Sequence, residues 1–267
     1  MSNTSALSDV RCFDPHQDYS VAWKRLPHWA QAGTACFITW RTADSLPEEA
    51  ITRLDQQRQE LLREQQLDPS GDWKQALAKL PPTVRARIHW LLFTAWDEQL
   101  DSAAGACVLR EPALCKIVMK SLKHFDNDRY VLTDAVVMPN HVHALVAFRD
   151  EGMLLTQCTS WKHYTATEIN KWLRANCGVE EELSRGATEL RSPVAPRLGS
   201  PQLGVPPPSG EFWQVEQFDH LVRSPEDFEK YRRYIAENPV KAGLPEGSFR
   251  YYSKASSEES QSRRACE

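Results

Sequence analysis

The sequence lacks the features that mark membrane and secreted proteins. It has no run of about 18 apolar residues, the length that a membrane span requires. Its first residues, MSNTSALSDVRCFDP, hold no apolar signal core, so we expect no export. The seven cysteines include no CxxC pair, and their odd number argues against a disulfide framework or a zinc ribbon. These absences predict a protein of the reducing cytoplasm.

The chain also lacks an excess of basic charge. Its formal net charge is −4, so no bulk basic field draws it to nucleic acid, and any DNA binding must rely on local patches. No phosphate-binding loop is visible, which predicts that no nucleotide cofactor is used. Apolar residues make up 41% of the chain, which is enough for a proper core.

Composition shifts along the chain predict one domain with two insertions. We expect this domain over residues 33–252, after an irregular arm over 1–32 and before a disordered tail over 253–267. A polar, Glu/Gln/Arg-rich region over about 48–104 indicates a helical insertion. A second region, over about 183–212, holds six of the 17 prolines and is typical of a linker.

Hydrophobic periodicity predicts alternating strands and helices in the rest of the chain. The expected strands cover residues 34–42, 129–138 and 141–148, and the expected helices cover 47–67, 111–125, 156–175 and 225–237. The second and third strands form a hairpin, because Pro139 and Asn140 break the apolar run between them. This order predicts an α+β fold, a ferredoxin-like sandwich whose antiparallel sheet is covered on one face by helices.

Two histidines interrupt the apolar strand VVMPNHVHALVAF. Residues i and i+2 of a strand share a face, so His141 and His143 should project side by side. Two imidazoles so placed can bind one divalent cation, and an oxygen ligand from elsewhere would make Mg²⁺ or Mn²⁺ suitable. The alternative is that both are ordinary polar residues on a solvated sheet face.

The segment FEKYRRYIAENPVKAGL carries a second set of polar residues on a predicted helix. Ser224 is a good N-cap before Pro225, and the residue before Pro239 should end the helix. Phe228, Tyr231 and Ile235 form a stripe that should face the core, which makes Tyr231 structural. Tyr234 lies at the edge of this stripe with Asn238 four residues on. Alternatively, Tyr234 is a packing residue and Asn238 only a cap.

Together, these motifs resemble a known family. MPNHVH before an apolar strand, and a distant helix ending in YIAENPVKAG, are similar to the REP-associated tyrosine transposases, single-tyrosine HUH transposases of bacterial insertion sequences. GTACFITWRT, SWKHYTATEIN and FWQVEQFDHLVRSPEDF add to the resemblance, which covers much of residues 27–45 and 107–252. The two insertions depart from the shortest family members.

The resemblance implies a metal-dependent endonuclease and strand transferase that acts on single-stranded DNA through a 5′-phosphotyrosine intermediate. It implies Tyr234 as the nucleophile and His141, His143 and Asn238 around the metal. Related enzymes carry glutamine where this chain has Asn238, which is one methylene shorter. It also implies recognition of hairpins from repetitive palindromic DNA by a monomer or homodimer, in the nucleoid of the bacterial cytoplasm.

Several DNA contacts and one rival nucleophile follow from position in the sequence. The candidate DNA-binding residues are Trp161 and Trp213, which could stack on bases, and Lys162, Arg223, Lys230 and Lys241, which could reach phosphates. The alternative is a solvated charged surface with tryptophans in the core. Tyr164, about 20 residues beyond the histidines, is a second candidate nucleophile. Rival functions are a non-catalytic binder of DNA hairpins, a rolling-circle replication initiator or relaxase, and an RNA-binding module.

Overall fold

The computed structural model describes most of the predicted domain. The described residues are 6–23, 27–46, 48–71, 73–81, individual positions between 83 and 95, 105–177, 211–215 and 217–255. Nearly all of the predicted Pro-rich linker and most of the predicted tail lie outside them. Within the described residues, no helix combines the length and the apolar character that crossing a membrane requires.

The domain is built on a five-stranded sheet with the order β6-β3-β5-β4-β7, in which all neighbouring strands are antiparallel. The strands are β3 (Ala35–Arg41), β4 (Tyr130–Val137), β5 (His141–Phe148), β6 (Phe218–Leu221) and β7 (Arg250–Ser253). Because β5 is antiparallel to both of its neighbours, β3 and β4 are parallel to each other across it. This split βαβ arrangement is ferredoxin-like, and the predicted α+β class is confirmed.

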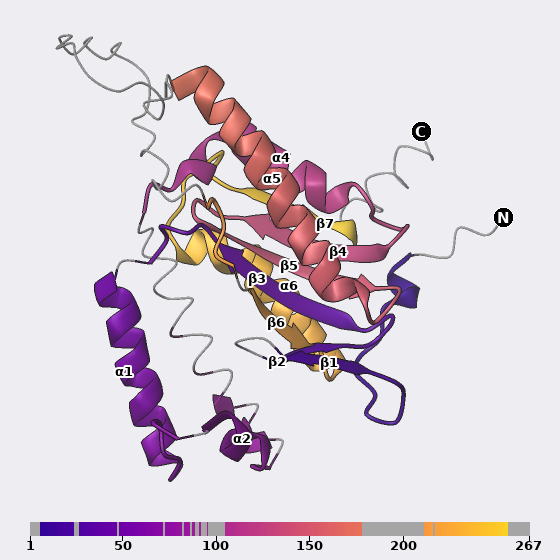
Figure 1. Cartoon of the computed structure of the whole chain (residues 1–267). Helices are drawn as coiled ribbons and strands as arrows, with labels where there is room; N and C mark the ends of the chain where they lie inside the picture. The colour runs from indigo at the N-terminus through magenta and orange to yellow at the C-terminus, as the bar shows by residue number, and fades with distance from the viewer. Residues whose placement is uncertain are drawn as a thin grey trace.

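Helices cover both faces of the sheet (Figure 1). Helices α4 (Pro112–Lys123) and α5 (Met153–Cys177) lie on one face, and α6 (Pro225–Lys241) lies on the other. The prediction that helices cover one face only is therefore wrong. The signal was in β4 and β5, which are buried along their whole length and read as nearly continuous apolar runs.

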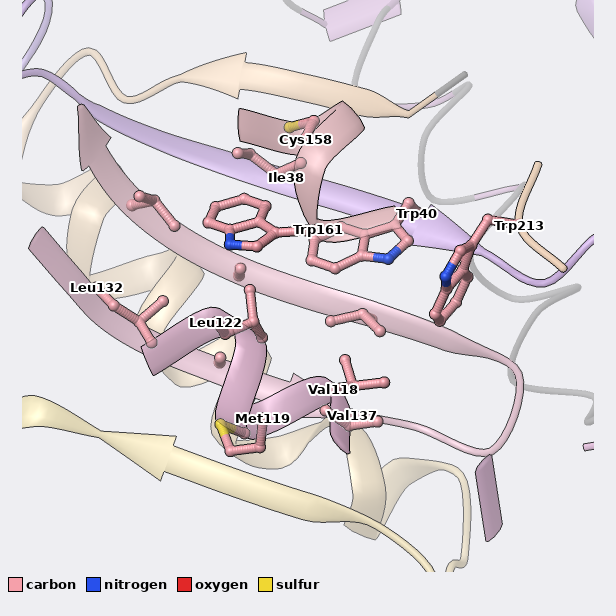
Figure 2. Close-up of a cluster of buried hydrophobic side chains, with 14 of the residues drawn as sticks. Ile38, Trp40, Val118, Met119, Leu122, Leu132, Val137, Cys158, Trp161 and Trp213 are labelled. Atoms are coloured by element: carbon pink, nitrogen blue, oxygen red, sulfur yellow. The ribbon is translucent and has the colours of Figure 1, made fainter. Parts of the chain in front are cut away.

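The larger core fills the space between the sheet and the helices α4 and α5 (Figure 2). Three tryptophans dominate it: Trp40 of β3 stacks on Trp161 of α5 with ring centroids 5.8 Å apart, and Trp213 meets Trp40 edge-on. A smaller core joins the opposite face to α6. In that core Tyr231 stacks on Phe37 at 4.5 Å, so its predicted structural role is confirmed.

Helix α6 begins as predicted and ends later than predicted. The Ser224 side chain accepts a hydrogen bond from the Asp227 amide, and Pro225 is the first helical residue. The helix then continues through Pro239 to Lys241, because the stop signal is Gly243. At φ +61°, Gly243 forms a Schellman end, in which the Leu244 amide donates to the Pro239 carbonyl oxygen at 2.9 Å. Asn238 therefore lies inside the helix.

The N-terminal arm contains structure that the sequence reading missed. The strands β1 (Ser20–Trp23) and β2 (Pro27–Ala30) form a separate antiparallel hairpin after the short 3₁₀ turn η1 (Ala6–Asp9). Buried His28 of β2 bonds to buried Asp219 of β6, which ties the hairpin to the main sheet.

The predicted helical insertion contains helices where it is described. They are α1 (Glu48–Glu64) and α2 (Trp73–Ala78), which lie to one side of the sheet (Figure 1). A second 3₁₀ turn, η2 (Val108–Arg110), leads into α4.

Candidate active site

The two histidines of β5 lie on the face of the sheet that α6 covers. Both side chains are fully buried, and their ring centroids are 4.7 Å apart. His143 also stacks on Phe37 of the smaller core at 5.5 Å. The alternating residues Val142 and Ala144 point into the larger core on the opposite face. The predicted side-by-side placement is confirmed, and the alternative of a solvated sheet face is wrong.

Hydrogen bonds fix the orientation and the tautomer of both imidazoles. His141 Nδ1 lies 2.7 Å from Asn140 Oδ1, which can only accept, so Nδ1 carries the proton. His143 Nδ1 lies 2.7 Å from Thr39 Oγ1, and the Asn238 amide nitrogen approaches His143 Nε2 at 3.4 Å. With the amide in this orientation, Nε2 of His143 accepts, and Nε2 is the unprotonated nitrogen of both imidazoles.

Burial keeps His141 neutral. Loss of hydration lowers the pKa of His141 well below its ordinary value, and the neighbouring His143 lowers it further. A neutral imidazole with a lone pair on Nε2 and a proton donated from Nδ1 is the form in which histidine binds metal ions. Neither Asn140 nor Thr39 was predicted. The signal for both was a polar residue within or beside an apolar strand.

Helix α6 brings Tyr234 and Asn238 to the histidine pair. The ring of half-buried Tyr234 meets His143 edge-on with centroids 5.4 Å apart, and it meets Phe37 edge-on at 5.7 Å. Asn238 is buried and contacts the same imidazole one helical turn later. The predicted proximity of residue 234 to the pair is confirmed, although more than 90 residues of sequence separate them.

The donor set fits a divalent cation. Asn238 Oδ1 is buried and has no hydrogen-bond partner within the described part of the chain, although a buried amide oxygen normally has one. Turning this amide would present an oxygen beside two Nε2 lone pairs. No group of three or more His, Cys, Asp or Glu residues able to hold a metal occurs among the described residues. A cation at this site would therefore need the amide, or the substrate, as an oxygen ligand.

The rival nucleophile lies on the wrong face of the sheet. Tyr164 is exposed on α5, which packs through Trp161 against the larger core. Helix α5 lies on the face of the sheet opposite α6 (Figure 1), and the histidine pair lies on the α6 face. The assignment of Tyr164 as a second candidate nucleophile is therefore wrong for this fold.

Two of the predicted DNA contacts are buried, and a third makes hydrogen bonds within the fold. Trp161 and Trp213 are buried in the larger core (Figure 2), and the Trp213 indole nitrogen donates to Thr165 Oγ1 at 2.9 Å. Their burial removes the ring faces from solvent, which corrects the prediction that they stack on bases. The Lys162 ammonium donates to the Val215 carbonyl oxygen and to Gln217 Oε1, each at 2.8 Å, so it ties α5 to the chain before β6.

The other predicted DNA contacts lie along α6. Arg223 precedes the helix, Lys230 lies in its second turn and Lys241 is its last residue, and all three are exposed. The Lys241 ammonium lies 5.6 Å from the centre of the Tyr234 ring and 3.2 Å from Glu237 Oε2. Of these three cations, Lys241 borders Tyr234, and the contact of all three with DNA stays a prediction.

Comparison with known proteins gives one distant likeness. No protein-family model and no curated protein sequence matches this chain. Among solved structures, the chain is similar to a REP-associated tyrosine transposase bound to a REP hairpin. The identity is 15%, the TM-score is 0.33, and the alignment covers 84% of this chain and 76% of the other.

Proposed function

We propose that this protein cleaves and rejoins single-stranded DNA at hairpin-forming sequences, as a metal-dependent strand transferase of the transposase type. The observation that carries the proposal is the edge contact between Tyr234 and His143, 5.4 Å between ring centroids, beside a second buried imidazole. A phenol hydroxyl held next to two potential metal ligands is suited to covalent attack on a phosphodiester.

The chemical step transfers the strand to the protein. Tyr234 Oη attacks the scissile phosphorus, the bond from phosphorus to the 3′-oxygen breaks, and the phenol proton passes to the released 3′-oxygen. The products are a 5′-phosphotyrosine and a free 3′-hydroxyl. Because the phosphotyrosine keeps the bond energy, the reverse attack by a 3′-hydroxyl rejoins the strand without ATP.

His141, His143 and Asn238 would hold Mg²⁺ or Mn²⁺. When bound, such a cation polarises a non-bridging phosphate oxygen and offsets the negative charge that builds up there. The protein itself contributes positioning, because β5 and α6 hold the phenol and the imidazoles on two rigid elements. Positioning of this kind contributes up to about 7–11 kcal/mol in the best cases. A free phenol has a pKa of about 10, so little phenolate exists at neutral pH without such help.

The decisive experiment is a search for a covalent adduct. The purified chain is incubated with Mn²⁺ and a pool of oligonucleotides, each with one hairpin and randomised single-stranded flanks, and is run on a denaturing gel. The proposed polarity predicts that label at the 3′ end moves with the protein and that label at the 5′ end is released.

Two phenol variants separate the candidates. Tyr234→Phe removes only the hydroxyl, so it should abolish the adduct and leave the fold nearly intact. Tyr164→Phe, on the opposite side of the sheet, is the matched control and should form the adduct at the wild-type rate. Hairpin binding without an adduct would support a non-catalytic binder. An adduct that survives in Tyr234→Phe would refute the assigned nucleophile.

A further inference from the structure

Arg41 lies on the same face of the sheet as the histidine pair and was not predicted to have a role. In the register between β3 and β5, Arg41 is opposite His141 and Thr39 is opposite His143. Directly opposed residues of antiparallel strands project from the same face, with Cβ atoms about 4.5–5.5 Å apart. The contact between Thr39 and His143 confirms this face, so Arg41 and His141 are neighbours in the same way.

The backbone around Arg41 is held from both sides. Its carbonyl oxygen accepts a hydrogen bond from the Gln214 amide at 2.9 Å. The next residue, Thr42, donates its amide hydrogen to the Asn140 carbonyl oxygen at 2.8 Å. Asn140 also accepts from His141 through its side chain, so His141 and Thr42, the residue after Arg41, are bonded to the same asparagine. Such an arrangement keeps two side chains in constant register.

The side chain of Arg41 is bonded to a buried serine of the following turn. Its Nη1 donates to Ser45 Oγ at 3.0 Å, and Ser45 is fully buried. The Ser45 hydroxyl helps to orient the guanidinium. Burial lowers the pKa of Arg41 to about 10, so the guanidinium is still charged at neutral pH. A partly buried guanidinium beside a phosphate site has the planar donor geometry that suits two phosphate oxygens.

We propose that Arg41 is a further catalytic residue, which donates hydrogen bonds to a non-bridging oxygen of the scissile phosphodiester. It stabilises the charge that accumulates on that oxygen while the Tyr234–phosphorus bond forms and the bond to the 3′-oxygen breaks, and it transfers no proton. This role rests on the DNA-cleaving function proposed above. The alternative is that Arg41 only anchors the turn at Ser45.

The test compares a charged and an uncharged scissile linkage. The substrate is a hairpin oligonucleotide that the wild type cleaves at a known linkage. That linkage is made either as the phosphodiester or as the neutral methylphosphonate. Arg41→Gln should slow adduct formation on the phosphodiester about 100-fold, the typical loss for one donor at a developing oxyanion. On the methylphosphonate, wild type and Arg41→Gln should react at similar rates, because the charge that Arg41 offsets is absent.

Three further variants make the test decisive. Arg41→Lys keeps the charge but loses the planar fork, and it should show a smaller defect that the methylphosphonate also removes. If Arg41→Gln fails to melt cooperatively, Arg41→Lys takes its place in the comparison. Ser45→Ala should slow the reaction less than Arg41→Gln, and Arg250→Gln, an exposed arginine of β7, should react as the wild type does.

The two ways to fail are distinct. An Arg41 variant that cleaves the phosphodiester at the wild-type rate, or one with the same defect on both linkages, overturns the assignment to Arg41 alone. A wild type that forms no adduct with any hairpin DNA overturns the proposed function itself.

Discussion

We expect the loss of Arg232 to destabilise the fold much more than the loss of its ion-pair partner Asp134. Arg232 of α6 donates from Nε to Asp134 Oδ2 of β4 at 3.0 Å. The two side chains differ in exposure, 1% for Asp134 and 26% for Arg232. Arg232 also lies 3.2 Å from Glu229, while Asp134 has a long contact of 3.4 Å with the Tyr251 hydroxyl.

These surroundings set the magnitudes. Arg232→Met leaves a carboxylate with almost no access to water, and breaking a buried pair in this way costs about 3–5 kcal/mol. Asp134→Asn leaves an arginine that can reach water and Glu229, so we expect a loss of about 1–2 kcal/mol. Arg233→Met, at the exposed neighbouring position, is the matched control and should change stability by less than about 0.5 kcal/mol.

Urea unfolding of the three single variants and of the double variant gives the free energies. Because Asp134→Asn removes the stranded charge, the double variant should be more stable than Arg232→Met alone by at least about 1 kcal/mol. Equal losses for Arg232→Met and Asp134→Asn, or a further loss in the double variant, would refute the reasoning. Since α6 carries Tyr234 two residues after Arg232, adduct formation should also slow in Arg232→Met and stay unchanged in Arg233→Met.

Three other variants have definite expectations. Asn238→Ala should raise the Mn²⁺ concentration needed for half-maximal adduct formation, read from a metal titration, because it removes the amide oxygen from the donor set. Gly243→Ala should lower the free energy of unfolding in urea by about 1 kcal/mol, because φ is +61° although nothing lies within 4 Å of an added Cβ. Burial raises the pKa of Tyr130 to about 12, whereas the phenol of the unfolded chain loses its proton at about pH 10. The contribution of the neutral phenol to the free energy of unfolding is therefore complete below about pH 10 and is lost as the pH rises toward 12. Between about pH 10 and pH 12, the free energy of unfolding measured in urea should therefore fall less in Tyr130→Phe than in the wild type.

The hairpin of β4 and β5 could be predicted because its signals are local. The break at Pro139 and Asn140 and the apolar runs on both sides fixed the turn, and β5 spans the predicted residues 141–148. The bulge within β4 could not be predicted. Leu132 is opposite Val146 and Asp134 is opposite Leu145, so Thr133 is an extra residue that turns Asp134 toward α6. Nothing in the local sequence specifies that step.

The end of α6 shows how two local signals can compete. The residue before a proline avoids the helical region, which favoured an end at Asn238. Gly243, five residues later, offers the left-handed conformation that closes the last turn, and the helix follows this second signal. The difference matters for the site, because a helical Asn238 projects one turn beyond Tyr234 on the same side.

The β1–β2 hairpin and the second covered face could not be read from the sequence for a different reason. Both depend on contacts between distant segments, such as His28 with Asp219 and Tyr231 with Phe37. The stripe of Phe228, Tyr231 and Ile235 predicted that α6 has a buried side. The stripe alone does not predict which face of the sheet the buried side of α6 packs against.

The candidate site depends on the periodicity of one helix and of one strand. Four residues of helix rise about 6 Å, and two residues of strand rise about 6.6 Å. Tyr234 and Asn238, one helical turn apart, both contact the imidazole of His143, and the His141 ring lies beside that imidazole with centroids 4.7 Å apart. A shift of one residue on the helix would turn either side chain by about 100°, away from the sheet. A shift of one residue on the strand would send the imidazoles into the tryptophan core on the other face. The two-residue spacing of the histidines on the strand and the four-residue spacing of Tyr234 and Asn238 on the helix thus keep all four side chains between β5 and α6.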